Sequence, residues 1–234
     1  MGKKYLLAVF SAAILAFPLF AYAPGDLVLN PEIQVGFEIP AIRQNTDYPA
    51  GKENGNYVSL GLCWGLRLSA YYRISNYFSA GLGLGFEGVH NQYNFTYYVQ
   101  ASETDAYTER STYDTYYFVI PAGFRAHIRA LNLGAGLTGY IPLAAKFSGD
   151  IKQNNVHSPL SDAGFKVNPF IGGYFDIGYD WAEKDGNSRG FNMNLRVETS
   201  FSDKIADGDM DYKTFRHIAV SLTAGYSFRV LSFR

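Results

Sequence analysis

The residues that could carry catalysis are few and widely separated. The chain has four histidines, His90, His127, His157 and His217, and a single cysteine, Cys63. Nucleophilic catalysis needs a serine or cysteine within hydrogen-bond reach of a base, and a third group that orients the base. No spacing marks such a set, so we expect no catalytic residue and no enzyme activity. The alternative is a serine and a histidine brought to the same end of the fold.

Metal binding has one candidate segment. Asp207, Asp209 and Asp211 alternate as in the first half of a calcium loop, but Tyr212 stands where that loop needs glycine, and Ile218 where it needs glutamate. A solvated acidic loop therefore fits better than a calcium site. One cysteine provides neither a disulfide framework nor a cysteine-rich zinc site. We expect no metal ion and no cofactor.

Composition narrows the class of protein. The 234 residues are 47% hydrophobic, 17% aromatic and 18% charged, with a formal net charge of −1. Soluble domains usually carry about 25% charged residues. A net charge near zero, without a run of lysine or arginine, argues against nucleic acid as a partner. The length fits one domain, and the aromatic content favours β-structure.

The N-terminal residues have the layout of a secretory signal peptide. Lys3 and Lys4 precede an uncharged, largely apolar stretch over 5–20, and Ala21-Tyr22-Ala23 follows as a small-x-small cleavage site. The apolar stretch is shorter than the about 20 residues that span a bilayer. We predict a signal peptide over 1–23 and one mature domain over 24–234, with an uncleaved anchor as the alternative.

Period-2 alternation dominates the mature chain. Between Val58 and Tyr72, for example, apolar side chains occupy the even positions and small or polar ones most odd positions, which is typical of a two-faced strand. The same pattern recurs along the chain. The eight alternating segments lie at about 33–39, 57–72, 78–86, 116–128, 131–145, 167–181, 191–201 and 218–228.

The two faces of these segments differ in charge. The apolar face carries none, whereas the opposite face holds glycine, serine and a few charges of both signs, including Lys146. Small residues and sparse charges suit a narrow polar interior with little apolar lining, so we expect the apolar face to meet lipid. A soluble exported carrier with an inverted barrel is the alternative. We predict an interior charge network, with a packing role favoured over gating, formed by Arg67, Glu87, Arg125, Asp176, Arg196 and Glu198.

The connections between segments indicate how the strands are arranged. Links are short near residues 73–76 and 129–130 and moderate at 182–190, but long near 40–55, 90–113, 148–164 and 203–213. We therefore predict an all-β, eight-stranded antiparallel transmembrane β-barrel, an up-and-down meander with both termini on the short-link, periplasmic side. Aromatic residues near the short links would form an interfacial girdle: Tyr72, Phe78, Tyr179, Trp181, Phe191 and Phe228.

The long link over 90–113 is unusually aromatic. Its alternation persists in parts, so we expect the flanking strands to continue beyond the bilayer. Exposed tyrosines offer a large amphipathic contact area at a small entropic cost, which suits binding to an external partner. The alternative is that these rings pack on neighbouring loops. The candidate contact residues are Tyr93, Phe95, Tyr97, Tyr98, Tyr107 and Tyr113.

Four segments carry a recognisable pattern: Tyr117-Phe118-Val119-Ile120-Pro121-Ala122-Gly123-Phe124-Arg125, Gly134-Ala135-Gly136-Leu137, Tyr140-Ile141-Pro142-Leu143 and the turn Tyr71-Tyr72-Arg73-Ile74-Ser75-Asn76-Tyr77-Phe78. These segments resemble small outer-membrane β-barrel domain families, which are porin-like or similar to OmpX and OmpW and occur in spirochaetes and Bacteroidetes. Near the end, Thr223-Ala224-Gly225-Tyr226-Ser227-Phe228-Arg229-Val230 resembles the signal read by the barrel assembly machinery. The chain continues beyond Phe228 to Arg234 instead of ending in an aromatic residue, which leaves open the residue that closes the last strand.

The resemblance implies a location in the bacterial outer membrane, with the lipid of that membrane and the barrel assembly machinery as partners. Together with the residue pattern, it favours a non-catalytic structural or surface-interaction protein that contacts an extracellular ligand or host surface. The alternative is a narrow porin or OmpW-like conduit for small or apolar solutes. That role would require an apolar patch opening into the interior or sideways between strands.

Overall fold

The computed structural model describes residues 22–44, 58–98, 106–153, 156–160, 166–185, 188–202 and 212–233. Most of the expected signal peptide and the acidic segment with Asp207, Asp209 and Asp211 lie outside these residues. The elements are β1 (Asp26–Gln44), β2 (Val58–Arg73), β3 (Phe78–Tyr98), β4 (Ala106–Ile128), β5 (Leu131–Gln153), β6 (Val156–Leu160), β7 (Phe170–Asp180), α2 (Trp181–Asp185), β8 (Arg189–Ser200) and β9 (Tyr212–Ser232).

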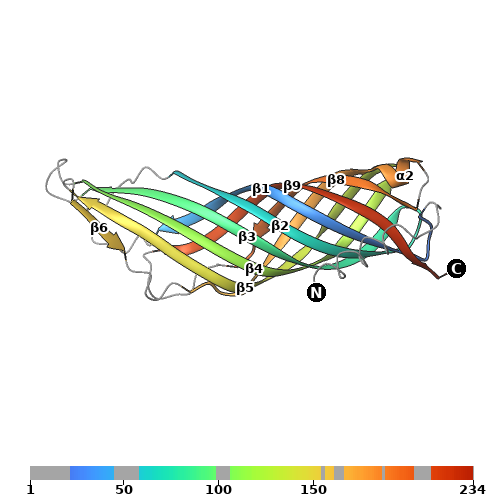
Figure 1. Ribbon diagram of the computed structural model, residues 1–234, viewed down its shortest axis with the longest axis horizontal. Helices are drawn as coiled ribbons and strands as arrows, with labels where there is room; N and C mark the ends of the chain where they lie inside the picture. Colours follow the sequence, from blue (N-terminus) through green and yellow to red (C-terminus); the bar gives the residue numbers. More distant parts are fainter. Residues whose placement is uncertain are drawn as a thin grey trace, which may run out of the picture.

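Eight of these strands close into a ring. Each pairs antiparallel with its neighbours in chain order, β5 pairs with β7, and β1 pairs with β9 over most of its length. The short strand β6 lies outside the ring and adds to the end of β5. Figure 1 shows the resulting elongated barrel, with the strands tilted relative to its long axis. The predicted fold class, an eight-stranded antiparallel meander, is confirmed.

The pairing of β3 with β4 continues to Tyr98 and Ala106, in agreement with the expected continuation of these two strands. Three other features differ from the expected strand pattern. The strand β5 extends to Gln153, into an expected loop. The strand β6 was not predicted. The helix α2 occupies part of the link after β7, where Asp180 Oδ1 accepts a hydrogen bond of 2.9 Å from the backbone N–H of Ala182. This N-terminal cap favours a helical turn over an open link. Among the described residues, no helix is long and apolar enough to cross a membrane.

The side chains alternate between a buried interior and an apolar exterior. Leu62 and Leu137 are each 54% exposed and Leu195 is 49% exposed, whereas Arg196 is 1% exposed. A soluble barrel would bury these leucines. Because the apolar surface faces outward on all eight barrel strands, the predicted orientation of the two faces is correct and the exterior is the face that meets lipid.

The apolar belt has a sharp upper boundary on β3, β4 and β5. Outward positions are apolar up to Phe86, Tyr116 and Leu143, and beyond them the same surface carries charged or polar residues such as His90 and Lys146. At this boundary a bulge shifts the pairing of β4 with β5 by one residue, between Tyr116 and the next position. The strands therefore continue by about ten residues, or roughly 30 Å along the strand, beyond the lipid-facing belt.

The bulge corrects one expectation from the sequence. Lys146 was expected on the inner face, but it is exposed, and Phe147 is buried instead. An extra residue in one strand of a pair reverses the alternation beyond it, so the parity that holds up to Leu143 no longer holds above the bulge.

Replacing an outward belt residue with arginine tests which face meets lipid. Leu137→Arg should lower the free energy of unfolding from phospholipid vesicles by about 2–4 kcal/mol, since a lipid-facing arginine near the bilayer midplane is costly. Ser148→Arg, on the outer face of the same strand above the belt, should cost about 0–1 kcal/mol. Equal costs in urea titrations would contradict a lipid-facing belt.

Candidate functional site

The six charged residues expected inside the barrel all lie there. Each is at most 4% exposed, and together they come from β2, β3, β4, β7 and β8. They point inward because each lies on the face opposite the apolar belt. They form two clusters, in which the members are Arg67, Glu87 and Glu198, and Arg125, Asp176 and Arg196.

The first cluster is centred on Arg67. Its Nη2 donates to Glu87 Oε2 at 2.9 Å and to Glu198 Oε2 at 3.0 Å. Thr138 Oγ1 donates to the other oxygen of Glu198 at 3.1 Å. Arg67 thus joins β3 to β8 across the interior. A buried charge without a partner costs several kcal/mol, so this shared pairing is what makes the two carboxylates tolerable there.

The second cluster is centred on Asp176. Arg196 Nη2 lies 2.8 Å and Arg125 Nη2 3.7 Å from Asp176 Oδ2. Each arginine also covers an aromatic ring, with the guanidinium carbon 4.4 Å from the ring centroid of Tyr174 for Arg196 and of Tyr71 for Arg125. Cation–π contacts add to the ion pairs because the buried rings replace water around the guanidinium groups. The two clusters fill the middle of the lumen with bulky side chains.

Sequence reasoning missed the polar residues that β1 contributes to the lumen. Glu32, Gln34 and Glu38 are at most 3% exposed. Asn30 Nδ2 donates to Glu32 Oε1 at 2.6 Å, and Asn91 Nδ2 donates to Glu38 Oε1 at 3.0 Å. The sequence did contain a signal for their inward position, since these glutamates alternate with the apolar positions of β1.

An aromatic layer fills the lumen toward the long-link end, where little apolar lining was expected. Tyr140 and Phe170 stack with ring centroids 4.3 Å apart and an interplanar angle of 9°. Tyr117 meets Phe170 edge-on at 5.5 Å, and His217 meets Phe170 at 5.4 Å. The expectation failed because tyrosine and phenylalanine also occupy inner-face positions of the alternating segments. This layer is part of the described interior and packs together with Val119.

At the short-link end, one histidine has a partner arrangement that resembles a catalytic triad. Ser79 Oγ lies 2.9 Å from His127 Nε2, and His127 Nδ1 lies 3.6 Å from Glu183 Oε1. However, Arg73 Nη2 holds the same oxygen of Glu183 at 2.6 Å, and Ser79 is only 1% exposed. The His127–Glu183 distance is too long for a hydrogen bond, so His127 is not oriented as a base.

The same residues explain how α2 is held at this end of the barrel. Arg73 at the end of β2 is 4% exposed and ties β2 to α2 through Glu183. Burial raises the pKa of Glu183 to about 7, and Arg73 opposes this shift by favouring the ionised carboxylate. Asp180 Oδ2 accepts from Ser227 Oγ at 3.2 Å, which ties the start of α2 to β9. These contacts fit a structural closure better than an exposed nucleophile.

Most of the expected aromatic girdle faces outward. Phe78 and Phe191 are 55% and 67% exposed, Tyr72 is 44% and Trp181 38% exposed, and Tyr179 is half-buried with its ring 4.9 Å from that of Trp181. Phe228 is the exception, since it is 7% exposed and does not offer its ring to lipid. It pairs with Leu29 of β1 in the same register as Ala224 with Ile33, so the strand pairing does not explain its burial.

The expected extracellular contact residues divide into two groups. Tyr113 is 4% exposed and packs on Phe147 with ring centroids 5.0 Å apart, so it is part of the interior and not an exposed contact. Its odd position in β4 places it on the inner face, as for Tyr117. The others lie within β3 and β4, and their side chains are outside the described residues: Tyr93, Phe95, Tyr97, Tyr98 and Tyr107.

Comparison with known proteins yields similar folds only. No family model and no curated protein matches the chain. Among solved structures, outer membrane protein OprG from Pseudomonas aeruginosa shares 10% identity over 91% of this chain and 99% of its own, with a TM-score of 0.41. Neisserial surface protein A shares 11% identity over 89% and 99%, with a TM-score of 0.33. The Escherichia coli outer membrane protease OmpT shares 8% over 92% and 99%, with a TM-score of 0.38. The barrel assignment therefore rests on this chain's own strand pairing.

We predict that the charged clusters can form only if the lumen positions beside them are glycine. A Cβ on Gly134 would collide with the carboxylate of Asp176, whereas a Cβ on Gly139 would meet only the backbone oxygen of Ile120, at 3.9 Å. Gly134→Ala should therefore lower the free energy of unfolding by about 1–3 kcal/mol, as overpacking does. Gly139→Ala, on the lipid face of the same strand, should change it much less. Urea unfolding of both variants in vesicles decides whether the lumen is this tightly packed.

Removing Arg67 should leave two buried carboxylates without their shared cation. We expect Arg67→Met to lower the free energy of unfolding by about 3–5 kcal/mol, while Lys152→Met, an exposed cation on β5, has little effect. Adding Glu87→Gln and Glu198→Gln should restore much of the loss, because no net charge then remains to be neutralised. A triple variant no more stable than Arg67→Met would contradict an electrostatic role for Arg67.

Proposed function

We propose that this chain is an integral barrel of a bacterial outer membrane, with both termini periplasmic, that acts without catalysis as a structural or surface-contact protein. The observation that carries the proposal is the filled interior below strands that continue past the lipid-facing belt. The barrel closes its own lumen, and its extended end is the part available to partners. Outer-membrane lipid and the barrel assembly machinery are the partners that such a location requires.

The layered contents of the lumen support a closed barrel. Aromatic rings occupy the long-link end, the two arginine clusters occupy the middle, and the Arg73–Glu183 pair with α2 occupies the short-link end. Eight-stranded barrels have an interior just wide enough for side chains to fill. In the part of the chain that the structure describes, a filled interior of this kind supplies rigidity and obstructs the passage of solutes.

The extended sheet supports a role at the cell surface. Beyond the belt, β3, β4, β5 and β6 continue as one paired sheet, visible at the left end of the barrel in Figure 1. Two histidine–aspartate pairs link its strands, with His90 Nδ1 2.6 Å from Asp114 Oδ1 and His157 Nδ1 2.9 Å from Asp150 Oδ2. A paired sheet presents side chains in fixed positions, as a contact surface for an extracellular ligand or a host surface requires.

One observation favours the alternative of a narrow conduit. Buried nitrogen atoms in the lumen, including Arg67 Nη1, Arg196 Nη1 and Gln34 Nε2, have no hydrogen-bond partner among the described residues. Buried polar atoms of this kind are normally satisfied by ordered water. A lumen that admits single waters would be compatible with slow passage of very small solutes, so conductance separates the two functions.

Planar bilayer recordings test whether the lumen is closed. We expect the purified barrel to give no steady ohmic openings, because described side chains occupy both ends and the middle of the lumen. The variant Tyr140→Ala with Phe170→Ala removes the stacked rings and should produce brief openings, while Ile141→Ala, on the lipid face beside them, should not. Steady openings of the unmodified protein would favour the conduit.

Epitope accessibility tests the proposed orientation. A tag inserted within 101–104, between β3 and β4, should be labelled by antibody on intact cells. A tag at the C-terminus should be labelled only after the outer membrane is permeabilised, since the start of β1 and the end of β9 lie at the short-link end. The reverse pattern would contradict the periplasmic placement of the termini.

A further inference from the structure

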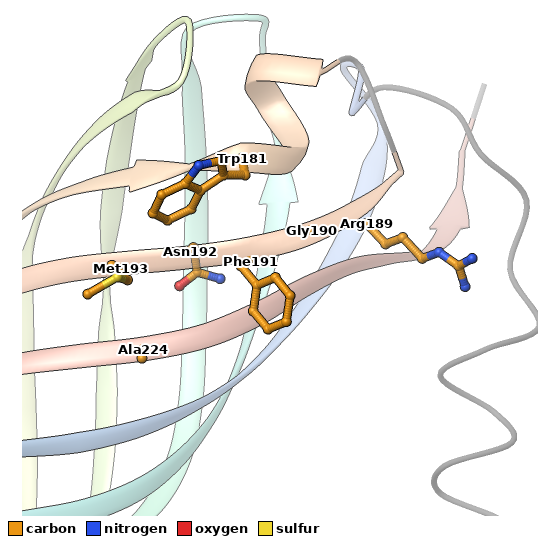
Figure 2. Close-up of a pocket in the computed structure, with 7 residues that line it drawn as sticks. All are labelled: Trp181, Arg189, Gly190, Phe191, Asn192, Met193 and Ala224. Carbon is orange, nitrogen blue, oxygen red and sulfur yellow. The ribbon is translucent and has the colours of Figure 1, made fainter.

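The outer surface of the barrel has an open groove near α2. It has a volume of about 560 Å³ and is lined by Trp181, Arg189, Gly190, Phe191, Asn192, Met193 and Ala224. Figure 2 shows the Trp181 indole on one side of β8 and the Phe191 ring on the other. The groove therefore opens on the lipid side of the barrel wall.

The groove exists because one small residue interrupts a surface of large ones. Ala224 pairs with Met193 on β8 and with Ile33 on β1, and its neighbours on the outer face of β9 are Leu222 and Tyr226. Phe191 lines the depression, and its ring contacts that of Tyr226 edge-on with centroids 5.1 Å apart. Trp181, 38% exposed, overhangs it from the start of α2.

The walls of the groove are apolar, and Arg189 is the one charged residue among the seven described residues that line it. Phe191 and Met193 are 67% and 40% exposed, whereas the Asn192 side chain is buried in the lumen, where it donates to Asn30 Oδ1 at 2.7 Å. None of the seven described residues that line the groove is acidic. Arg189 is half-exposed at the first position of β8, and its guanidinium extends away from the barrel wall at the short-link end.

This combination matches the chemistry of a phospholipid. An acyl chain fits an apolar groove within the belt, and an arginine at the level of the aromatic girdle lies where lipid phosphates are found. We infer that the groove binds one anionic phospholipid of the periplasmic leaflet, with an acyl chain between Trp181 and Phe191 and its phosphate at Arg189. The inference rests on the proposed orientation in the outer membrane.

The chain has two tryptophans, Trp64 and Trp181, which provide a direct test. Trp181 lines the groove, and Trp64 is 49% exposed on the open lipid face of β2. In Trp64→Phe, the fluorescence of Trp181 reports the groove, and in Trp181→Phe, that of Trp64 reports the bulk lipid. Both variants are placed in phosphatidylcholine vesicles that contain increasing fractions of chain-brominated phosphatidylglycerol or chain-brominated phosphatidylcholine, which quench tryptophan on contact.

Trp181 should be quenched by brominated phosphatidylglycerol at about fivefold lower mole fraction than by brominated phosphatidylcholine, the effect expected of one cation at the membrane surface. Trp64 should show no preference. Arg189→Gln should abolish the preference at Trp181, whereas Arg129→Gln, a cation in the turn between β4 and β5 at the same end of the barrel, should leave it unchanged. Ala224→Phe should reduce quenching of Trp181 by both lipids, because it fills the groove.

Equal quenching of Trp181 by the two lipids, or a preference that survives Arg189→Gln, would overturn the groove proposal while leaving the barrel in the membrane. Absence of quenching at Trp64 by either lipid would overturn the membrane placement, and the groove proposal with it. The two failures are therefore distinguishable in one set of titrations.

Discussion

Every other feature of this molecule depends on the pairing of β1 with β9, which leaves the ring of strands without an open edge. In hydrocarbon, an unpaired backbone N–H or C=O has no water to bond, so an open sheet edge is not stable there. Once the ring is closed, the outer side chains stabilise the barrel because they are apolar and contact lipid. The inner side chains stabilise it by packing against one another. The two faces of each strand are thus selected by two different environments.

In the interior of the barrel, glycines lie opposite large charged side chains and make room for them. Gly134 leaves room for Asp176, which holds Arg196 and Arg125, and Gly85 approaches Arg67 so closely that a Cβ would lie 2.8 Å from the Cγ of that arginine. Glycine weakens isolated strands, but here it makes space for the charged groups that fill the lumen. The polar network and the glycine content are therefore two parts of one packing solution.

Much of this arrangement could be predicted from alternation alone. The inward position of Arg67 and the outward position of Leu137 follow from their parity in their strands. Parity failed for Lys146, because the bulge that reverses it has no signature in the sequence. For Tyr113 the parity signal was present beyond the belt, but the strand extension was interpreted as exposed on both faces, so its ring was predicted to contact an external partner. The contact of Arg67 with Glu198 depends on the shear of the closed barrel, which local patterns do not encode.

The sequence separations within the two arginine clusters bear on the order of assembly. Arg67 meets Glu87 within the hairpin of β2 and β3, 20 residues away, but its second partner Glu198 is 131 residues away. Arg196 and Asp176 likewise belong to one hairpin, 20 residues apart. Each hairpin can thus neutralise most of its own charge before β1 pairs with β9. Glu198 is paired with Arg67 only when the two halves of the chain meet. Neutralisation of this last carboxylate therefore coincides with closure of the barrel. The Arg67–Glu198 ion pair thus favours completion of the ring in a single late step.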